Sequence, residues 1–358
     1  PTEFDIAAVN IEENGNREPV PYAVPPGIIR EQDVASANLR SMNEQSLAMS
    51  VCNLNDGDAK AAYRNVTFDM RQYKRLRMFA HIEAKGVESE LRDKDLTVFV
   101  RLGSDFDQNY YEYEMPMSVT PWYTNDDTEI WPEDNNFDIV IKDLQDLKAS
   151  RPAAYSNLQA YSKKLSENVQ ITVKGNPNIS NVTVLMIGVR NPDDKKNVFS
   201  NSDDGKAKCA IVWVNELRLS EFDNTSGWAA IGRMTAQVAD LATVNVAGNI
   251  STPGWGSVEQ KVQQRQQETK TGVDASTTVQ MGKFFPEKWG VQMPLYMGFS
   301  ENVSTPRYSP LQPDLELAEL PNLSKPLKKK SQTMTRRRSV NVTNLKIVPK
   351  KDSGGGDP

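Results

Sequence analysis

The chain has 358 residues, a formal net charge of −5 at neutral pH and a mean hydropathy of −0.58. This length allows two or three domains with sizeable cores. A transmembrane helix needs roughly 18 or more consecutive apolar residues, and no such run occurs, so we expect no helical membrane span. The sequence begins with Pro1 and shows no signal peptide, so we interpret it as a processed or excised piece of a longer protein.

Residues 1–50 are predicted to form an extended arm followed by a short helix. Prolines are frequent in residues 1–29, and proline both lacks a backbone donor and disfavours helix at the residue before it. Helical spacing then appears within residues 30–51, where several apolar side chains roughly share one face. These side chains are Val34, Ala37, Leu39 and Met42.

Residues 51–222 are predicted to form an antiparallel, jelly-roll-like β-sandwich. Apolar and polar residues alternate in short runs, for example from Leu76 to Ala84, and Gly, Asn and Asp separate the runs. Such alternation is typical of strands that bury one face. The stretch near residues 138–166 has helical spacing instead, so we expect a helical insertion there, broken at Pro152.

The two cysteines, Cys52 and Cys209, lie far apart in the sequence. A disulfide between them would stabilise the fold by roughly 4–5 kcal/mol on the chain-entropy model. Two buried thiols are the alternative, because Cys209 lies within a strongly apolar strand. Their spacing matches neither a zinc site nor a redox motif.

Within residues 223–300, four stretches alternate strictly between apolar and polar side chains: 228–238, 242–250, 273–281 and 291–300. A strand crosses the ~25 Å apolar layer of an outer membrane in ~9–11 tilted residues, with apolar side chains toward lipid and polar ones toward a wet lumen. We therefore predict two transmembrane hairpins, as antiparallel strands of a large outer-membrane β-barrel. The predicted lipid-facing residues are Trp228, Met234, Val238, Val244, Val246, Val279, Met281, Leu295 and Phe299. The predicted lumen-facing residues are Arg233, Gln237, Asn245, Asp274 and Gln280.

The connections between these stretches suggest an orientation. The turn at Ala239–Leu241 is the shortest, and short turns are typical of the periplasmic side of outer-membrane barrels. This orientation would place residues 251–271, a mobile loop or a marginal helix, and the sandwich outside the cell. The turn at residues 283–290 fits a membrane-interface rim, with a small satellite core as the alternative. Its aromatic residues are Phe284, Phe285 and Trp289.

Residues 301–358 are predicted to form a basic loop and the start of a further strand at 339–348. Residues 325–358 hold ten Lys/Arg and two Asp, a net +8, whereas the rest of the chain holds 32 Lys/Arg and 45 Asp/Glu, a net −13. The basic stretch 325–338 could bind nucleic acid, but residues 325–350 contain no aromatic side chain on which a base could stack. We therefore favour a solvated loop and expect no nucleic-acid partner.

We expect no catalytic, metal or cofactor site. His81 is the only histidine and shares the polar side of its strand with Arg75 and Glu83, so we expect it at the surface. One histidine without a Cys/His cluster provides neither a Ser-His-Asp triad nor a zinc site. The acids around Asp105 fit a strand-to-strand turn better than a calcium loop, because the glycine and the final glutamate of an EF-hand are missing.

Two other classes of protein stay open as alternatives. One is a secreted jelly-roll carbohydrate-binding module that uses Trp122, Tyr123 and Trp131 as an aromatic platform. In such a module the strands at 228–300 would pack on protein rather than face lipid. The other is a glycosidase with paired acids, which is a weaker alternative because the sequence places no such pair.

Three motifs occur in order along the chain: IWPEDNNFDI at 130–139, IVWVNELRLSEFD at 211–223 and GWAAIGRM at 227–234. With these motifs the chain resembles the SprA/Sov family of Bacteroidetes, the outer-membrane translocon of the type IX secretion system, which is also required for gliding motility. The resemblance continues through the strands at 272–300 and through RRRSVNVTNLKI, so the chain is similar to an internal piece of a much larger protein. The order of the motifs is specific, whereas WVNELRL alone also ends many jelly-roll sandwiches.

The resemblance implies a pore for folded cargo proteins that carry C-terminal secretion signals. It also implies an outer-membrane location, a lateral barrel partner, a periplasmic plug, and neither catalysis nor a cofactor. This piece would supply a few barrel strands and one inserted sandwich, and it is too short to close a pore alone. Its expected partners are the rest of the barrel chain, other secretion components, cargo and membrane lipid.

Overall fold

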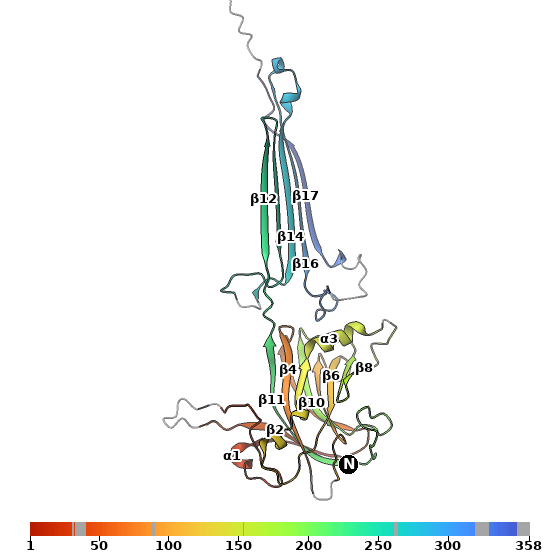
Figure 1. Ribbon diagram of the computed structural model, residues 1–358. Helices are drawn as coiled ribbons and strands as arrows, with labels where there is room; N and C mark the ends of the chain where they lie inside the picture. The colour runs from red at the N-terminus through yellow and green to blue at the C-terminus, as the bar shows by residue number, and fades with distance from the viewer. Residues whose placement is uncertain are drawn as a thin grey trace, which may run out of the picture. The chain divides into compact units, whose positions relative to one another are not determined.

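The computed structural model describes residues 1–30, 32, 41–86, 90–152, 154–260, 264–318 and 329–348. The chain forms two compact units, Pro1–Asp223 and Asn224–Pro358. Both are built mainly from antiparallel strands (Figure 1). The predicted mainly β, antiparallel fold class is therefore confirmed.

The first unit is a sandwich of two antiparallel sheets. One sheet has the strand order β1-β2-β11-β4-β7 and the other β3-β10-β5-β6-β9-β8. The strands of the first sheet are β1 (Glu3–Asn10), β2 (Gln45–Leu54), β11 (Lys208–Phe222), β4 (Tyr73–Ala84) and β7 (Phe137–Val140). Those of the second are β3 (Ala59–Phe68), β10 (Val182–Arg190), β5 (Thr97–Gly103), β6 (Tyr110–Pro116), β9 (Val169–Lys174) and β8 (Tyr161–Ser166).

Alternate residues of both sheets point inward and build one core. Met78 and Ile82 of β4 are almost fully buried, as are Val98 and Val100 of β5. Burying a side chain of this size contributes about 1.5–3 kcal/mol, so the shared core holds the two sheets together. Helix α3 (Ile141–Ser150) adds Ile141, Leu144 and Leu147 to the same core.

The insertion predicted near residues 138–166 contains α3, but the helical part is shorter than expected. The helix ends at Ser150, and Arg151, directly before Pro152, has left the helical region with ψ of 124°. Proline disfavours helix at the residue before it. Residues Tyr161–Ser166 form β8, because pairing with β9 overrides their local helical spacing.

The N-terminal arm is part of the sandwich and not a free extension. β1 pairs along β2, and the short helix α1 (Ile11–Asn14) follows, with the Asn10 side chain accepting a hydrogen bond from the Glu13 backbone N–H at 2.9 Å. The chain then packs against the outer face of the first sheet. Together with residues 130–131 and β11, it builds a second core there. This second core consists of Val9, Val20, Tyr22, Ile130, Trp131 and Trp213. The short helix α2 (Asp127–Ile130) ends at Ile130 of this core, and the 3-10 helix η1 (Glu133–Asn135) follows it.

The short helix predicted within residues 30–51 is not found at residues 45–51, which belong to a strand. Residues 33–40, the centre of the prediction, lie outside the described residues. Residues Gln45–Leu54 form β2, in which Met49 and Val51 are buried at a spacing of two. The sandwich therefore begins before residue 51.

Cys52 and Cys209 form a disulfide across a sequence separation of 157 positions. The two cysteines lie on the neighbouring strands β2 and β11, where Ala210 pairs with Val51. The sequence left two alternatives open, a disulfide or two buried thiols, and the structure contains the disulfide.

The second unit is one open antiparallel sheet with the strand order β12-β13-β14-β16-β17, and Figure 1 shows its strands as long ribbons side by side. These strands are β12 (Ala229–Val238), β13 (Ala242–Ser251), β14 (Glu268–Gln280), β16 (Pro294–Pro306) and β17 (Thr333–Val342). A short ladder joins β15 (Val291–Gln292) to β18 (Lys346–Ile347). Strands β12 and β17 are the two edges, and neither pairs with a further strand among the described residues. In the described part of the chain, no helix is long and apolar enough to cross a membrane.

Several boundaries in this unit differ from the prediction. Strand β14 already starts at Glu268, before the predicted start at 273, so the end of the stretch 251–271 is strand and not a mobile loop or a marginal helix. Met281 does not continue a strand, because it begins the 3-10 helix η3 (Met281–Phe284), and a second short turn, η4 (Glu287–Trp289), follows. Strand β16 continues to Pro306, beyond the predicted end at 300. The further strand starts at Thr333, so part of the expected basic loop is strand.

Candidate functional site: a two-faced sheet

The register of the second unit decides which side chains share a face. Residues directly opposite each other in an antiparallel pair place their side chains on the same side of the sheet. Met234 pairs with Val246, Val246 with Ala275, and Ala275 with Phe299. These four side chains therefore form one apolar row across four strands.

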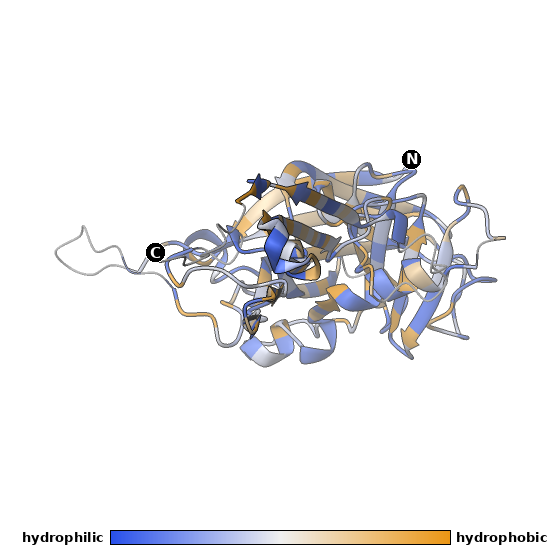
Figure 2. Cartoon of the chain, turned by 90° about the horizontal axis from the view of Figure 1, so that it is seen from above, coloured by the Kyte–Doolittle hydropathy of each residue, from blue (hydrophilic) through white to orange (hydrophobic). Residues whose placement is uncertain are grey.

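We call this side the apolar face because its rows are mainly apolar. The charged exceptions are Arg338, which continues the first row on β17, and Glu301 and Arg336 in one neighbouring row. Spaced two residues further along each strand, the next row holds Ala236, Val244, Thr277, Met297 and Val340. The row after it holds Val238, Ala242, Val279, Leu295 and Val342. Figure 2 shows the whole chain from above, with hydrophobic and hydrophilic residues interspersed along its elements.

The opposite side, which we call the polar face, carries mainly side chains that form hydrogen bonds. One row consists of Arg233, Ala247, Asp274, Ser300 and Arg337. Two further rows are Thr235, Asn245, Ser276, Gly298 and Ser339, then Gln237, Thr243, Thr278, Tyr296 and Asn341. The Thr235 hydroxyl donates to Asn245 Oδ1 at 2.9 Å.

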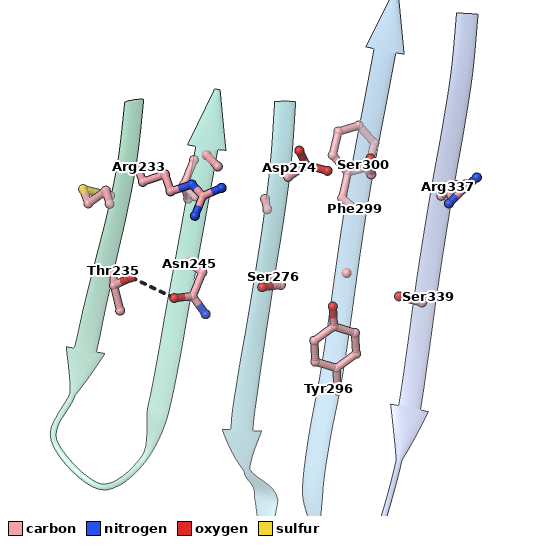
Figure 3. Close-up of a pocket in the computed structure, with 15 residues that line it drawn as sticks. Arg233, Thr235, Asn245, Asp274, Ser276, Tyr296, Phe299, Ser300, Arg337 and Ser339 are labelled. Atoms are coloured by element: carbon pink, nitrogen blue, oxygen red, sulfur yellow. Dashed lines mark hydrogen bonds between the residues drawn. The ribbon is translucent and has the colours of Figure 1, made fainter. Parts of the chain in front are cut away.

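A hollow of about 510 Å³ is lined largely by the polar face. Figure 3 shows its polar side chains distributed over all five strands, with the Thr235–Asn245 hydrogen bond dashed. Arg233 and Arg337 stand on the two edge strands, and Asp274 stands between them on the central strand β14. The hollow is thus a hydrophilic surface with a positive balance of charge and many neutral hydrogen-bonding groups.

The apolar face has no cover in the described structure. Neither hydrophobic core contains a residue of β12, β13, β14, β16 or β17. Met234 is 61% exposed and Val340 69% exposed. Large contiguous apolar surfaces on folded chains mark sites of contact with a partner or with membrane.

Aromatic side chains stand exposed at both ends of the sheet. Phe284, Phe285 and Trp289 lie in the connection between β14 and β16, and the rings of Phe285 and Trp289 stack with centroids 6.0 Å apart. Trp228 and Trp255 stand at the other end, next to the start of β12 and after the end of β13. Aromatic girdles at both rims are typical of a sheet that crosses a bilayer.

The structure brings together most of the residues that the sequence singled out. Met234, Val238, Val244, Val246, Val279, Leu295 and Phe299 share the apolar face, and Arg233, Gln237, Asn245 and Asp274 share the polar face. Trp228 directly precedes β12, Gln280 is the last residue of β14, and Met281 lies in η3. Sequence reasoning missed Arg337 and the residues before 339 on β17, because three consecutive arginines hide the alternation there.

His81 is buried, so the prediction of a surface histidine is wrong. Its Nδ1 lies 2.7 Å from the Ile130 carbonyl oxygen, which makes Nδ1 the protonated nitrogen, and its ring stacks on Trp213 at 3.9 Å. Burial lowers the pKa of His81 to about 3. Glu83 is buried beside it and pairs with Arg17 at 2.5 Å, and burial raises the pKa of Glu83. The arm covers this face of β4, and the local sequence could not show it.

The aromatic platform proposed for sugar binding does not form. Trp131 is only 2% exposed, and its indole N–H donates to the Ala23 carbonyl at 2.8 Å. Tyr123 is exposed, but Trp131 is part of the second core. The buried ring leaves the carbohydrate-binding alternative without the surface on which it depended.

The acidic residues of the first unit have local structural contacts. Asp105 accepts hydrogen bonds from the backbone N–H groups of Gln108 and Asn109 and so caps the turn between β5 and β6. Among the described residues, Asp56, Asp193 and Asp194 bring their carboxylates within 4.8 Å of one another. These three are loop residues that could offer oxygen ligands to a cation.

The fold and the two-faced sheet define a class: a β-rich chain in which a sandwich is followed by an amphipathic antiparallel sheet. Within this class, the chain belongs to the SprA_N family of motility related/secretion proteins, whose family model matches residues 1–320. The resemblance indicated by the three sequence motifs is thus confirmed at the level of the family. A search of curated proteins gives no match. Membership makes this a motility- and secretion-related protein and is consistent with a place in the cell envelope.

Proposed function

We propose that the second unit is a section of the wall of the type IX secretion pore in the bacterial outer membrane. The pore passes folded cargo proteins to the cell surface and serves gliding motility. One observation carries the proposal: the register of five strands gathers most apolar side chains on one face and most polar ones on the other, with Glu301, Arg336 and Arg338 as the charged exceptions on the apolar face. No catalytic step is part of this function, which rests on shape and on the polarity of the lumen.

The dimensions of the sheet support a membrane span. Strands β12, β13 and β17 have 10 residues each. At about 3.3 Å per residue, a tilted strand of this length matches the ~25 Å apolar band of an outer-membrane barrel. The apolar face would then contact lipid and the polar face would line a water-filled lumen.

The connections support an orientation. Residues 239–241 and 281–293 connect strands at one end of the sheet. The longer connections, 252–267 and 307–332, leave and rejoin the sheet at its other end. Outer-membrane barrels have short periplasmic turns and longer extracellular loops. Because the chain enters β12 at the end with the long connections, we propose that the preceding sandwich lies at the cell surface.

The open edges support a partnership with more wall. Strands β12 and β17 present unpaired backbone groups on their outer edges in the described structure. Such groups cannot remain unpaired in lipid. The rest of the barrel chain therefore supplies the neighbouring strands, and the lateral partner, the plug and the cargo are contacts of the completed pore. No nucleic acid is among the proposed partners.

Adjacent substitutions on opposite faces test this proposal in the full-length protein. Val244→Arg puts a charge on the apolar face, which at mid-membrane costs up to about 2–4 kcal/mol. We expect loss of the folded, heat-modifiable band in outer-membrane fractions and loss of cargo secretion. Asn245→Arg, one residue along the same strand, puts the same charge on the polar face.

The Asn245→Arg variant is the matched control and should assemble normally. Band intensity and secreted cargo are measured for both variants at equal synthesis. Equal tolerance of both arginines, or equal loss with both, would show that β13 does not separate lipid from water.

A further inference from the structure

The apolar face contains one charged cluster, on β16 and β17. Glu301 and Arg336 are directly opposite each other, in the row next to that of Phe299. Arg336 Nη2 lies 2.5 Å from Glu301 Oε2, and Arg336 Nε donates to the same oxygen at 2.6 Å. The charges of Glu301 and Arg336 therefore cancel each other.

Arg338 belongs to the same cluster but has no counter-charge. It lies opposite Phe299 on the apolar face. Among the residues that the structure describes, Arg338 forms neither an ion pair nor a hydrogen bond through its side chain. The cluster therefore holds two guanidinium groups and one carboxylate, and it carries a net positive charge.

The position of Arg338 keeps it away from the rims of the sheet. It lies near the middle of β17, with the apolar rows of Val340 and Val342 on one side and Met334 beyond Arg336 on the other. Charged side chains on the lipid face of a barrel are most unfavourable near the middle of the bilayer. An unpaired Arg338 facing acyl chains would be at such a place.

The edge of β17 indicates what covers Arg338. The backbone groups on the outer edge of β17 need a strand partner if the sheet lies in lipid. A strand added there places one side chain directly opposite Arg338, with the two Cβ atoms about 4.5–5.5 Å apart. The Glu301–Arg336 pair on the other side of β17 shows how a cross-strand carboxylate satisfies an arginine on this face.

We propose that the outer edge of β17 pairs with a further strand of the same wall that carries an aspartate or glutamate opposite Arg338. The proposal rests on the proposed function, because only a lipid environment makes the unpaired arginine unfavourable. The incoming carboxylate makes the cluster neutral and fixes the register of the new strand. The partner is thus identified by its chemistry: a β-strand with one acidic residue on its apolar face.

The direction in which one substitution shifts the melting temperature tests the proposal, in the full-length protein in outer membranes. Arg338→Met removes the charge and keeps the length of the side chain. With an acidic partner, the variant leaves a carboxylate unpaired, so the temperature at which the heat-modifiable band disappears shifts downward. Val340→Met, on the same face of the same strand, is the control and shifts little. An upward shift for Arg338→Met would mean that Arg338 faces lipid alone and would overturn the proposal.

A photo-crosslinking residue at position 338 keeps the proposal testable if Arg338→Met fails to accumulate. Crosslinking to a peptide that contains Asp or Glu supports the proposal, and crosslinking to lipid alone overturns it. The Val244→Arg variant separates this result from the proposed function. If Val244→Arg assembles normally, the membrane wall itself is wrong; if it fails while Arg338→Met raises the melting temperature, only the acidic partner is wrong.

Discussion

His81 and Glu83 lie on the outer face of β4, at positions where alternation predicts exposed polar side chains. Both are fully buried because the N-terminal arm packs over them. His81 stays neutral, with Nε2 buried and without a hydrogen-bond partner among the described residues. Burial raises the pKa of Glu83, and Arg17 reaches its carboxyl group from the arm and opposes this rise. At the scale of single residues, the stability of the first unit thus depends on two titratable groups in one apolar pocket.

The buried histidine predicts a pH dependence of unfolding. The pKa of His81 is about 3 in the fold, against 6.5 as its ordinary value, which we take for the unfolded chain. The unfolded chain therefore takes up a proton near pH 6.5 that the folded chain does not take up until about pH 3. Proton uptake by the unfolded chain lowers the free energy of unfolding as pH falls below 6.5, by at most about 1.4 kcal/mol per pH unit. Above pH 6.5 both states are neutral at His81, and the free energy of unfolding does not change on this account.

Urea unfolding of residues 1–223 at pH 7.5, 6.5 and 5.5, followed by tryptophan fluorescence, measures this loss. His81→Gln does not titrate, so its stability should fall less over the same range. Groups other than His81 are the same in both chains and do not affect the comparison. Parallel pH profiles for the two chains would contradict the account of His81.

The Arg17–Glu83 pair predicts a large and partly reversible effect. Arg17→Met leaves the carboxylate of Glu83 buried without its counter-charge, which typically costs about 3–5 kcal/mol for a buried pair. It should also raise the pKa of Glu83 further. Adding Glu83→Gln removes the orphaned charge and should restore part of the stability. Urea midpoints at pH 7.5 are measured for the unmodified chain, for Arg17→Met and for the double variant. A double variant no more stable than Arg17→Met would refute this account.

At the scale of elements, local alternation predicts best where strands form a single exposed layer. The hairpin β12–β13 follows the predicted stretches closely, because among the described residues nothing packs on the sheet to override the pattern. In the next hairpin, β14 starts at Glu268 instead of 273 and β16 ends at Pro306 instead of 300. The prediction fails at Met281, where Gly282 and Pro286 allow the chain to turn into η3 and η4. It also misses the first half of β17, because Arg336 and Arg338 occupy apolar-face positions.

Elements of the first unit depend more on contacts between distant segments. The arm packs against β4 and β11, about which its own proline-rich sequence contains no information. Strand β8 forms in a stretch with helical spacing because β9 pairs with it. The disulfide partners could be proposed from the sequence, but only the pairing of β2 with β11 brings the two cysteines together. Local pattern therefore predicted most strands of residues 51–222 but not β1, β2 or β8, and the second core and the burial of His81 required the tertiary structure.

At the scale of the whole molecule, the two units of the chain differ in how much of their apolar surface is buried. The first holds both hydrophobic cores and the disulfide. The second exposes an apolar face, a polar face and two unpaired edges. If this sheet is part of a membrane wall, as we propose, its surroundings must supply lipid, water and neighbouring strands in the right places. Membership of the motility related/secretion family agrees with a role as one section of a larger assembly.

The central claim, that one face meets lipid and the other water, is tested most directly by cysteine labelling along β13. Single cysteines at 243, 244, 245 and 246 are introduced into the full-length protein, whose Cys52 and Cys209 are already joined in a disulfide. A membrane-impermeant maleimide is then applied to outer-membrane vesicles. We predict labelling of Thr243→Cys and Asn245→Cys and protection of Val244→Cys and Val246→Cys. Uniform labelling, or the reverse alternation, would contradict the account.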